Sequence, residues 1–152
     1  MLVQLPQPEA FRVFTEEINL WWRGGLKYRI GRERSVLRLE PKLGGRLFES
    51  FTTASGERVC ETGRVTRWEP PSLLVLEWRA VNFAPGESTE VEVSFEASPS
   101  GTLVTVQHRG FARLRPDHPV RHGQEPRAFI RGMGLWWGSL LSALREHALL
   151  PR

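Results

Sequence analysis

The chain has 152 residues and a mass of 17.4 kDa, the usual size of one globular domain. Apolar residues make up 40% and charged residues 25% of it, which excludes a disordered chain, and no apolar run reaches the roughly 18–20 residues that span a bilayer. With one cysteine, Cys60, and four histidines, an internal disulfide and a Cys/His zinc framework are excluded too. Because Pro6 and Pro8 follow the first apolar residues, no signal peptide is expected. We therefore expect one soluble, cytoplasmic domain over residues 1–152, without a membrane segment, metal or cofactor.

The net charge of +4 raises the question of a nucleic-acid partner. Nucleic-acid binding proteins collect their cations in a patch, whereas the basic residues here are spread through the chain. The densest group contains Arg29, Arg32, Arg34 and Arg38, and Glu33 interrupts it. We expect no nucleic-acid partner.

The first elements expected are a short strand over Leu2–Leu5 and a helix that opens at Gln7-Pro8-Glu9. Proline and glutamate both suit the first turn of a helix. Apolar residues then recur at helical spacing, namely Phe11, Phe14 and Ile18. The helical pattern continues through Leu20-Trp21-Trp22 and ends at Gly24-Gly25.

From Val36 the apolar period changes to two, which predicts about six consecutive strands. They begin at Val36 and continue as Leu47–Phe51, Val59–Trp68, Leu73–Ala80, a strand around Val91, Val93 and Phe95, and Thr102–Arg109. Consecutive strands favour one antiparallel sheet over alternating βαβ units. The Gly44-Gly45-Arg46 motif lacks the pattern of a phosphate loop and is interpreted as a tight turn.

The last third of the sequence predicts a long loop followed by a long helix. Gly110–Arg127 contains three prolines and little periodicity, and loops of this length often cover a site. From about Arg127 to His147, apolar residues follow 3.6-residue spacing. They are Phe129, Met133, Trp136, Trp137, Leu140, Leu141, Leu144 and Ala148. The order of elements predicts an α+β fold in which a curved antiparallel sheet of six to seven strands wraps around the C-terminal helix, with a short helical pair after the first strand.

Several motifs along the whole chain resemble those of a known family. They are Pro8-Glu9-Ala10-Phe11, Trp21-Trp22, Glu40-Pro41, Gly44-Gly45-Arg46, Gly63-Arg64-Val65, Trp68-Glu69-Pro70-Pro71, Gln107-His108-Arg109-Gly110, and Trp137, Leu141 and Leu144 in the last helix. The chain resembles the START-like (SRPBCC) superfamily, in the branch named after the activator of the heat-shock-protein 90 ATPase. The resemblance implies a helix-grip fold. It departs from the family pattern at Trp136, where a glycine is usual, and nothing here corresponds to the second domain of the eukaryotic activator.

The six tryptophans are the main pointer to function, because indole rings make flat walls for a hydrophobic ligand. The alternative is ordinary core packing. The superfamily resemblance implies an apolar cavity between the sheet and the C-terminal helix. The residues expected to line it are Trp22, Trp78, Phe95, His108, Phe111, Phe129, Met133, Trp136 and Trp137.

The sequence does not assign a chemical role to the other polar residues. His108 shares a strand face with Val104 and Val106, and is either a polar group or general base in the cavity or a buried histidine with one hydrogen bond. Residues Asp117, His118, His122 and Glu125 have metal-binding side chains, but a solvated loop is the preferred interpretation. Cys60 is expected to be an inert packing residue.

Three functions remain open. The first is binding of a small hydrophobic, aromatic or lipid-like molecule, which is the partner we expect. The alternative is a chaperone-associated interaction module, and the third is an enzyme of the cyclase or hydrolase type. A chain of this kind fits a monomer or a homodimer.

Overall fold

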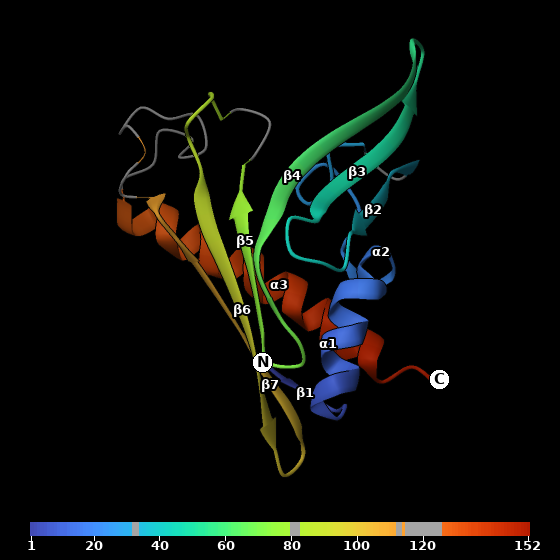
Figure 1. Cartoon of the computed structure of the whole chain (residues 1–152), viewed down its shortest axis with the longest axis vertical. Coiled ribbons are helices and arrows are strands. Elements are labelled where there is room, and N and C mark those ends of the chain that lie inside the picture. Colours follow the sequence, from blue (N-terminus) through green and yellow to red (C-terminus); the bar gives the residue numbers. More distant parts are fainter. Residues whose placement is uncertain (32–33, 80–82, 112–113, 115–125) are drawn as a thin grey trace.

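A computed structural model describes residues 1–31, 34–79, 83–111, 114 and 126–152. Among these residues seven strands form one antiparallel sheet in the order β1-β7-β6-β5-β4-β3-β2, which curls around the long helix α3 (Figure 1). The strands are β1 Leu2–Val3, β2 Val36–Leu39, β3 Arg46–Thr53, β4 Gly56–Glu69, β5 Leu73–Trp78, β6 Thr89–Ser98 and β7 Gly101–Arg109. The helices are α1 Gln7–Glu16, α2 Ile18–Trp21 and α3 Pro126–Ala148. The predicted helix-grip architecture is confirmed.

The element boundaries follow the predictions closely, with a few differences. The first strand pairs with β7 only over Leu2–Val3, because the carbonyl of Leu5 instead accepts a hydrogen bond from Thr102 Oγ1 (2.7 Å). The Gly44-Gly45 motif forms the predicted tight turn, in which Gly44 has a φ of +77°. The predicted loop over 110–127 falls mostly outside the described residues, as do Asp117, His118, His122 and Glu125.

The core lies between the inner face of the sheet and the helices. Alternate residues of the central strands are almost fully buried, as their period of two requires. They are Leu74, Leu76, Val91, Val93, Phe95 and Val104. The long helix supplies the opposite side with Trp137, Leu140, Leu141 and Leu144, which are at most 7% exposed. The shorter α1 covers the other end of the sheet, where Phe11 and Phe14 pack edge-on against Phe95 at ring distances of 5.0 and 5.5 Å.

The strands β3 and β4 form a long hairpin that extends beyond the rest of the sheet (Figure 1). Their register shifts where Leu47 pairs with Gly63 while Phe48 pairs with Glu61. Thr62 is the extra residue of the resulting β-bulge. Thr62 lines two of the pockets described below.

Two leucines of α3 provide a matched test of this packing. Leu140 is completely buried, whereas Leu135 is 71% exposed on the same helix. We expect Leu140→Ala to lower the free energy of unfolding by about 2–5 kcal/mol, because it removes methyl groups from a packed core. Leu135→Ala should change it by less than about 0.5 kcal/mol. Urea unfolding of both variants measures the difference, and equal effects would contradict this placement of α3.

Candidate functional site

The tryptophan cluster, which comprises Trp22, Trp78, Trp136 and Trp137, lies between the sheet and the middle of α3. Trp22 follows the end of α2, Trp78 ends β5, and the other two are consecutive on α3. Most ring pairs are edge-on, with centroids 5.0 Å apart for Trp136–Trp137 and 5.8 Å for Trp22–Trp137. Neighbours on a helix point about 100° apart. Trp137 is therefore buried in the core, while the half-buried Trp136 reaches the segment that contains residues 26–31.

Hydrogen bonds from the aromatic side chains fix this segment over the cluster. Trp22 Nε1 donates to the carbonyl of Tyr28 (3.0 Å), and Trp136 Nε1 donates to the carbonyl of Lys27 (2.9 Å). The Tyr28 hydroxyl in turn pairs with Ser139 Oγ on α3 (3.0 Å), and its ring stacks on Trp136 at 5.7 Å. The segment has little regular structure, yet side-chain bonds hold it in place.

Arg29 anchors the same segment from inside. Its side chain is buried, and burial lowers its pKa from the ordinary value. A guanidinium has five N–H donors. Here they reach the carbonyls of Arg23, Ser35, Asn19 and Trp22 and the side-chain oxygen of Asn19, at 2.7–3.2 Å. All its donors are thus used by the protein itself.

Glu49 is a second buried charged group beside this segment. It lies on β3 two residues after Leu47, so both side chains face the inner side of the sheet, and it is only 2% exposed. Its carboxylate oxygens accept hydrogen bonds from the backbone N–H groups of Ile30 (2.8 Å) and Gly31 (2.9 Å). Neither Glu49 nor Arg29 was predicted from the sequence. The signal that could have revealed Glu49 is a carboxylate at an inward position of an alternating strand.

A half-open pocket of about 310 Å³, here called the tryptophan pocket, lies beside these groups. This volume is at the lower end of the range for small-molecule sites. Of the predicted residues, Trp22, Trp78 and Trp136 line it. The rest of its wall is formed by Leu26, Lys27, Tyr28, Arg29, Ile30, Leu37, Leu47, Glu49 and Thr62.

Other predicted residues lie around a separate groove of about 410 Å³ between β7 and α3. His108, Phe111, Met133 and Trp137 line this groove. Phe129 is buried and packs edge-on against Phe111 at 4.9 Å. Phe95 belongs instead to the aromatic group around α1. The predicted residues are therefore not brought to one cavity, because the tryptophan cluster fills the space between the two openings.

His108 is half-buried, and both of its ring nitrogens are hydrogen-bonded within the protein, so neither is free for proton transfer. Its Nδ1 accepts a hydrogen bond from Trp137 Nε1 (3.1 Å), so the neutral ring carries its proton on Nε2, which donates to Thr89 Oγ1 (2.7 Å). Desolvation lowers the pKa of His108 to about 4. A proton on Nδ1 would also face the indole N–H. Of the two alternatives left open by the sequence, the geometry favours a histidine with satisfied hydrogen bonds over a general base.

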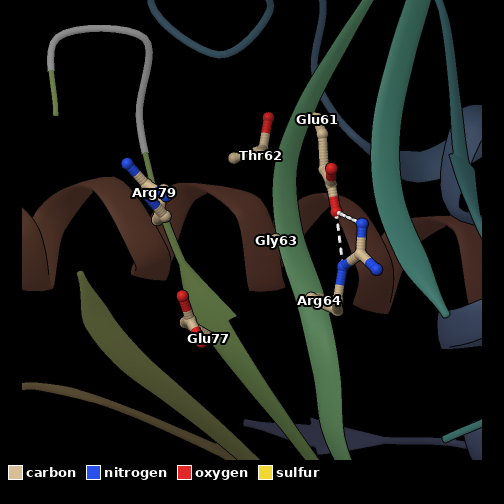
Figure 2. Close-up of a pocket in the computed structure, with 6 residues that line it drawn as sticks. All are labelled: Glu61, Thr62, Gly63, Arg64, Glu77 and Arg79. Carbon is tan, nitrogen blue, oxygen red and sulfur yellow. Dashed lines mark hydrogen bonds and ion pairs between the residues drawn. The ribbon is translucent and has the colours of Figure 1, made fainter. Parts of the chain in front are cut away.

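A third pocket, of about 330 Å³, lies on the side of β4 and β5 away from α3 and is lined mainly by charged residues (Figure 2). Glu61 and Arg64 pair along β4 at 2.6 Å, and the lining also includes Glu77 of β5 and Arg79, which follows that strand (Figure 2). Gly63 and Thr62 complete the lining. The opposite charges are balanced, and no predicted site residue lies here.

The described residues contain no group of three or more His, Cys, Asp or Glu side chains that could hold a metal ion. Within the same residues, no helix has the length and apolar character needed to cross a membrane.

The sequence from residue 4 to residue 145 matches the family model described as "Activator of Hsp90 ATPase homolog 1-like protein". The chain belongs to this family. None of the curated proteins matches it significantly.

Solved structures of proteins from several organisms share this fold. A protein from Mesorhizobium loti is 19% identical, with a TM-score of 0.60 over 96% of this chain and 90% of that one. An HSP90 activator from Plasmodium falciparum is 17% identical, with a TM-score of 0.61 over 97% and 91%. The AHSA1-like protein from Aeromonas hydrophila is 16% identical, with a TM-score of 0.57 over 95% and 85%. At these identities the likeness concerns the fold alone.

The placement of His108 predicts how stability depends on pH. Its folded pKa of about 4 lies below the ordinary value of 6.5, so the unfolded chain binds the proton more readily. This stabilisation is complete above pH 6.5 and is lost as the pH falls toward 4. Its size is on the order of 3 kcal/mol, at about 1.4 kcal/mol per pKa unit.

Urea unfolding of the wild type and of His108→Gln between pH 7 and pH 4 measures this contribution. We expect the free energy of unfolding to fall less steeply in the variant, because glutamine does not titrate. An NMR titration of the wild type should place the pKa of His108 near 4. A value near 6.5, or equal slopes in both proteins, would contradict the buried neutral ring.

Proposed function

We propose that this protein binds a small hydrophobic or aromatic molecule in the tryptophan pocket. The observation that carries the proposal is the wall formed by Trp22, Tyr28, Trp78 and Trp136 around about 310 Å³. The polar atoms of Trp22, Tyr28 and Trp136 are already bonded to the protein. These side chains therefore offer ring surface to a ligand and little competing polarity.

The pocket also has the rigidity that binding requires. Tyr28 and Trp136 stack on each other, and the segment that contains residues 26–31 is fixed from below by Arg29 and Glu49. A site that is already ordered loses less conformational entropy when it binds a ligand. The START-like resemblance noted above supports the same conclusion.

The proposal predicts saturable binding of uncharged apolar probes such as N-phenyl-1-naphthylamine or a panel of flat aromatics, with a change in tryptophan emission. We expect Trp136→Ala to weaken binding at least about tenfold, since a buried aromatic contact contributes more than about 1.4 kcal/mol. Leu135→Ala, at the exposed preceding position on α3, is the matched control and should bind as the wild type does.

Salt distinguishes this mode of binding from an ionic one. Burial of apolar surface depends little on ionic strength, whereas binding by a basic patch weakens steeply as salt rises. Uncharged probes should therefore bind equally at 50 mM and 500 mM salt. Failure of every uncharged probe to saturate would overturn the ligand proposal.

A second candidate function is association with an Hsp90-type chaperone. The observation that favours it is membership of a family described as activator of Hsp90 ATPase homolog 1-like, together with the fold shared with the Plasmodium falciparum HSP90 activator. Calorimetric titration with the purified chaperone of the same organism tests it, alongside the chaperone's ATPase rate. Binding and a faster ATPase would support this function, while no heat and no change in rate would exclude it.

The described residues give less support to an enzyme of the cyclase or hydrolase type. The tryptophan pocket contains one carboxylate, Glu49, and no histidine to form an acid–base pair with it. In the other groove, both ring nitrogens of His108 are engaged. Ligand binding needs no such pair and remains the function that the geometry supports best.

A further inference from the structure

The unused hydrogen-bonding capacity around the tryptophan pocket indicates what polar group its ligand carries. The N–H groups of Trp22 and Trp136 donate to backbone carbonyls, and the hydroxyl of Tyr28 pairs with Ser139. Arg29 uses all of its guanidinium donors within the protein. These groups have no donor left for a ligand.

Glu49 is different, because a carboxylate has about four acceptor positions and the backbone of residues 30 and 31 fills two of them. The side chain borders the pocket and is only 2% exposed, so water reaches it poorly. A buried acceptor of this kind gains most from a ligand that brings a donor. An anionic ligand would instead set a second negative charge near the first, which costs energy away from water.

Trp78 provides a hydrogen-bond donor. Its Nε1 has no hydrogen-bond partner among the described residues, whereas the other three indoles of the cluster each have one. Thr62, on the β-bulge, also borders the pocket, and its hydroxyl either donates or accepts. The residues that line the pocket therefore include a carboxylate, an indole N–H without a partner among the described residues, and a hydroxyl.

We propose that the ligand of the tryptophan pocket is a flat hydrophobic molecule that carries a hydroxyl group, whose O–H donates to Glu49. A hydroxyl both donates and accepts, so it fits this set of groups better than an ether, which only accepts, or a carboxylate, which repels Glu49. This inference rests on the proposed function and specifies its ligand class. Lys27 is exposed on the rim with its Nζ 5.7 Å from the Tyr28 ring centre. Of the two cations that line the pocket, it is the one that could bind an anion directly, because Arg29 uses its donors within the protein.

Three probes of similar shape separate these possibilities: 2-naphthol, its methyl ether 2-methoxynaphthalene, and 2-naphthoate. Titrations are followed by the indole N–H signals in ¹⁵N–¹H NMR spectra of the intact protein. We expect 2-naphthol to bind at least about tenfold more tightly than the methyl ether, since a hydrogen bond to a charged group contributes that much or more. The naphthoate should bind more weakly than both. The signals of Trp78 and Trp136 should shift, while that of Trp68, which packs against Phe11 near α1, should not.

Glu49→Gln should reduce the preference for naphthol over its methyl ether at least about fivefold, because the amide is uncharged and offers fewer acceptor positions. Glu61→Gln is the matched control, since Glu61 lines the outer charged pocket and pairs with Arg64. It should leave the preference unchanged. If Glu49→Gln does not fold, the comparison of the three probes on the wild type still decides.

The outcomes distinguish this inference from the proposed function. Equal binding of naphthol and its methyl ether, with the shifts at Trp78 and Trp136 retained, would overturn the hydroxyl ligand and leave the hydrophobic site intact. Tightest binding of the naphthoate would also overturn it, and would assign polar recognition to Lys27. Failure of all three probes to bind would overturn the proposed function itself.

Discussion

The structure depends on covering the inner apolar face of one curved sheet. A sheet with an apolar face is stable only when another layer buries it, and in this fold a single long helix must do most of that. One helix is narrower than seven strands, and α1 covers only the end near Phe95. The remaining gap is filled by the tryptophan cluster, whose large rigid rings bury much area with few rotatable bonds. One pocket borders the cluster at Trp22, Trp78 and Trp136, and a groove borders it at Trp137.

The segment that contains residues 26–31 turns one of these gaps into a pocket, and buried charges hold it there. Burying Arg29 and Glu49 costs solvation energy, which is offset only because their polar atoms are bonded. Arg29 bonds to four residues between Asn19 and Ser35, and Glu49 bonds to the backbone of residues 30 and 31. Gly31 is required at the close approach, since a Cβ there would lie 2.6 Å from the ring of Phe51. A loop without regular structure thus becomes a fixed wall.

Periodicity explains which parts of this arrangement were predictable. The strands from β2 to β7 and the helix α3 follow from apolar residues at spacings of two and 3.6, and the structure confirms them. Trp22, Trp78 and Trp136 were predicted because their size and chemistry suit a pocket. Periodicity gives the face on which a side chain lies but not its neighbours, so Phe95 was grouped with residues from which it is separated. The roles of Glu49 and Arg29 could not be predicted, because their hydrogen-bond partners are backbone groups and one side-chain amide that only folding brings close.

The hydrogen bonds of the indole rings stabilise the core and also shape the proposed binding site. A buried N–H without an acceptor costs about 1–3 kcal/mol, so every tryptophan on the inner face of a sheet needs one. Two indoles of the cluster use carbonyls of the neighbouring segment, and Trp137 uses the ring of His108. Neutral His108 therefore has a structural role in this apolar region, because its Nδ1 accepts the hydrogen bond of Trp137. Trp78 is half-buried and is the member of the cluster that the described residues leave without an acceptor. It lines the same pocket as Glu49, so a ligand with a polar group that accepts from its N–H would complete the pattern that stabilises the rest of the cluster.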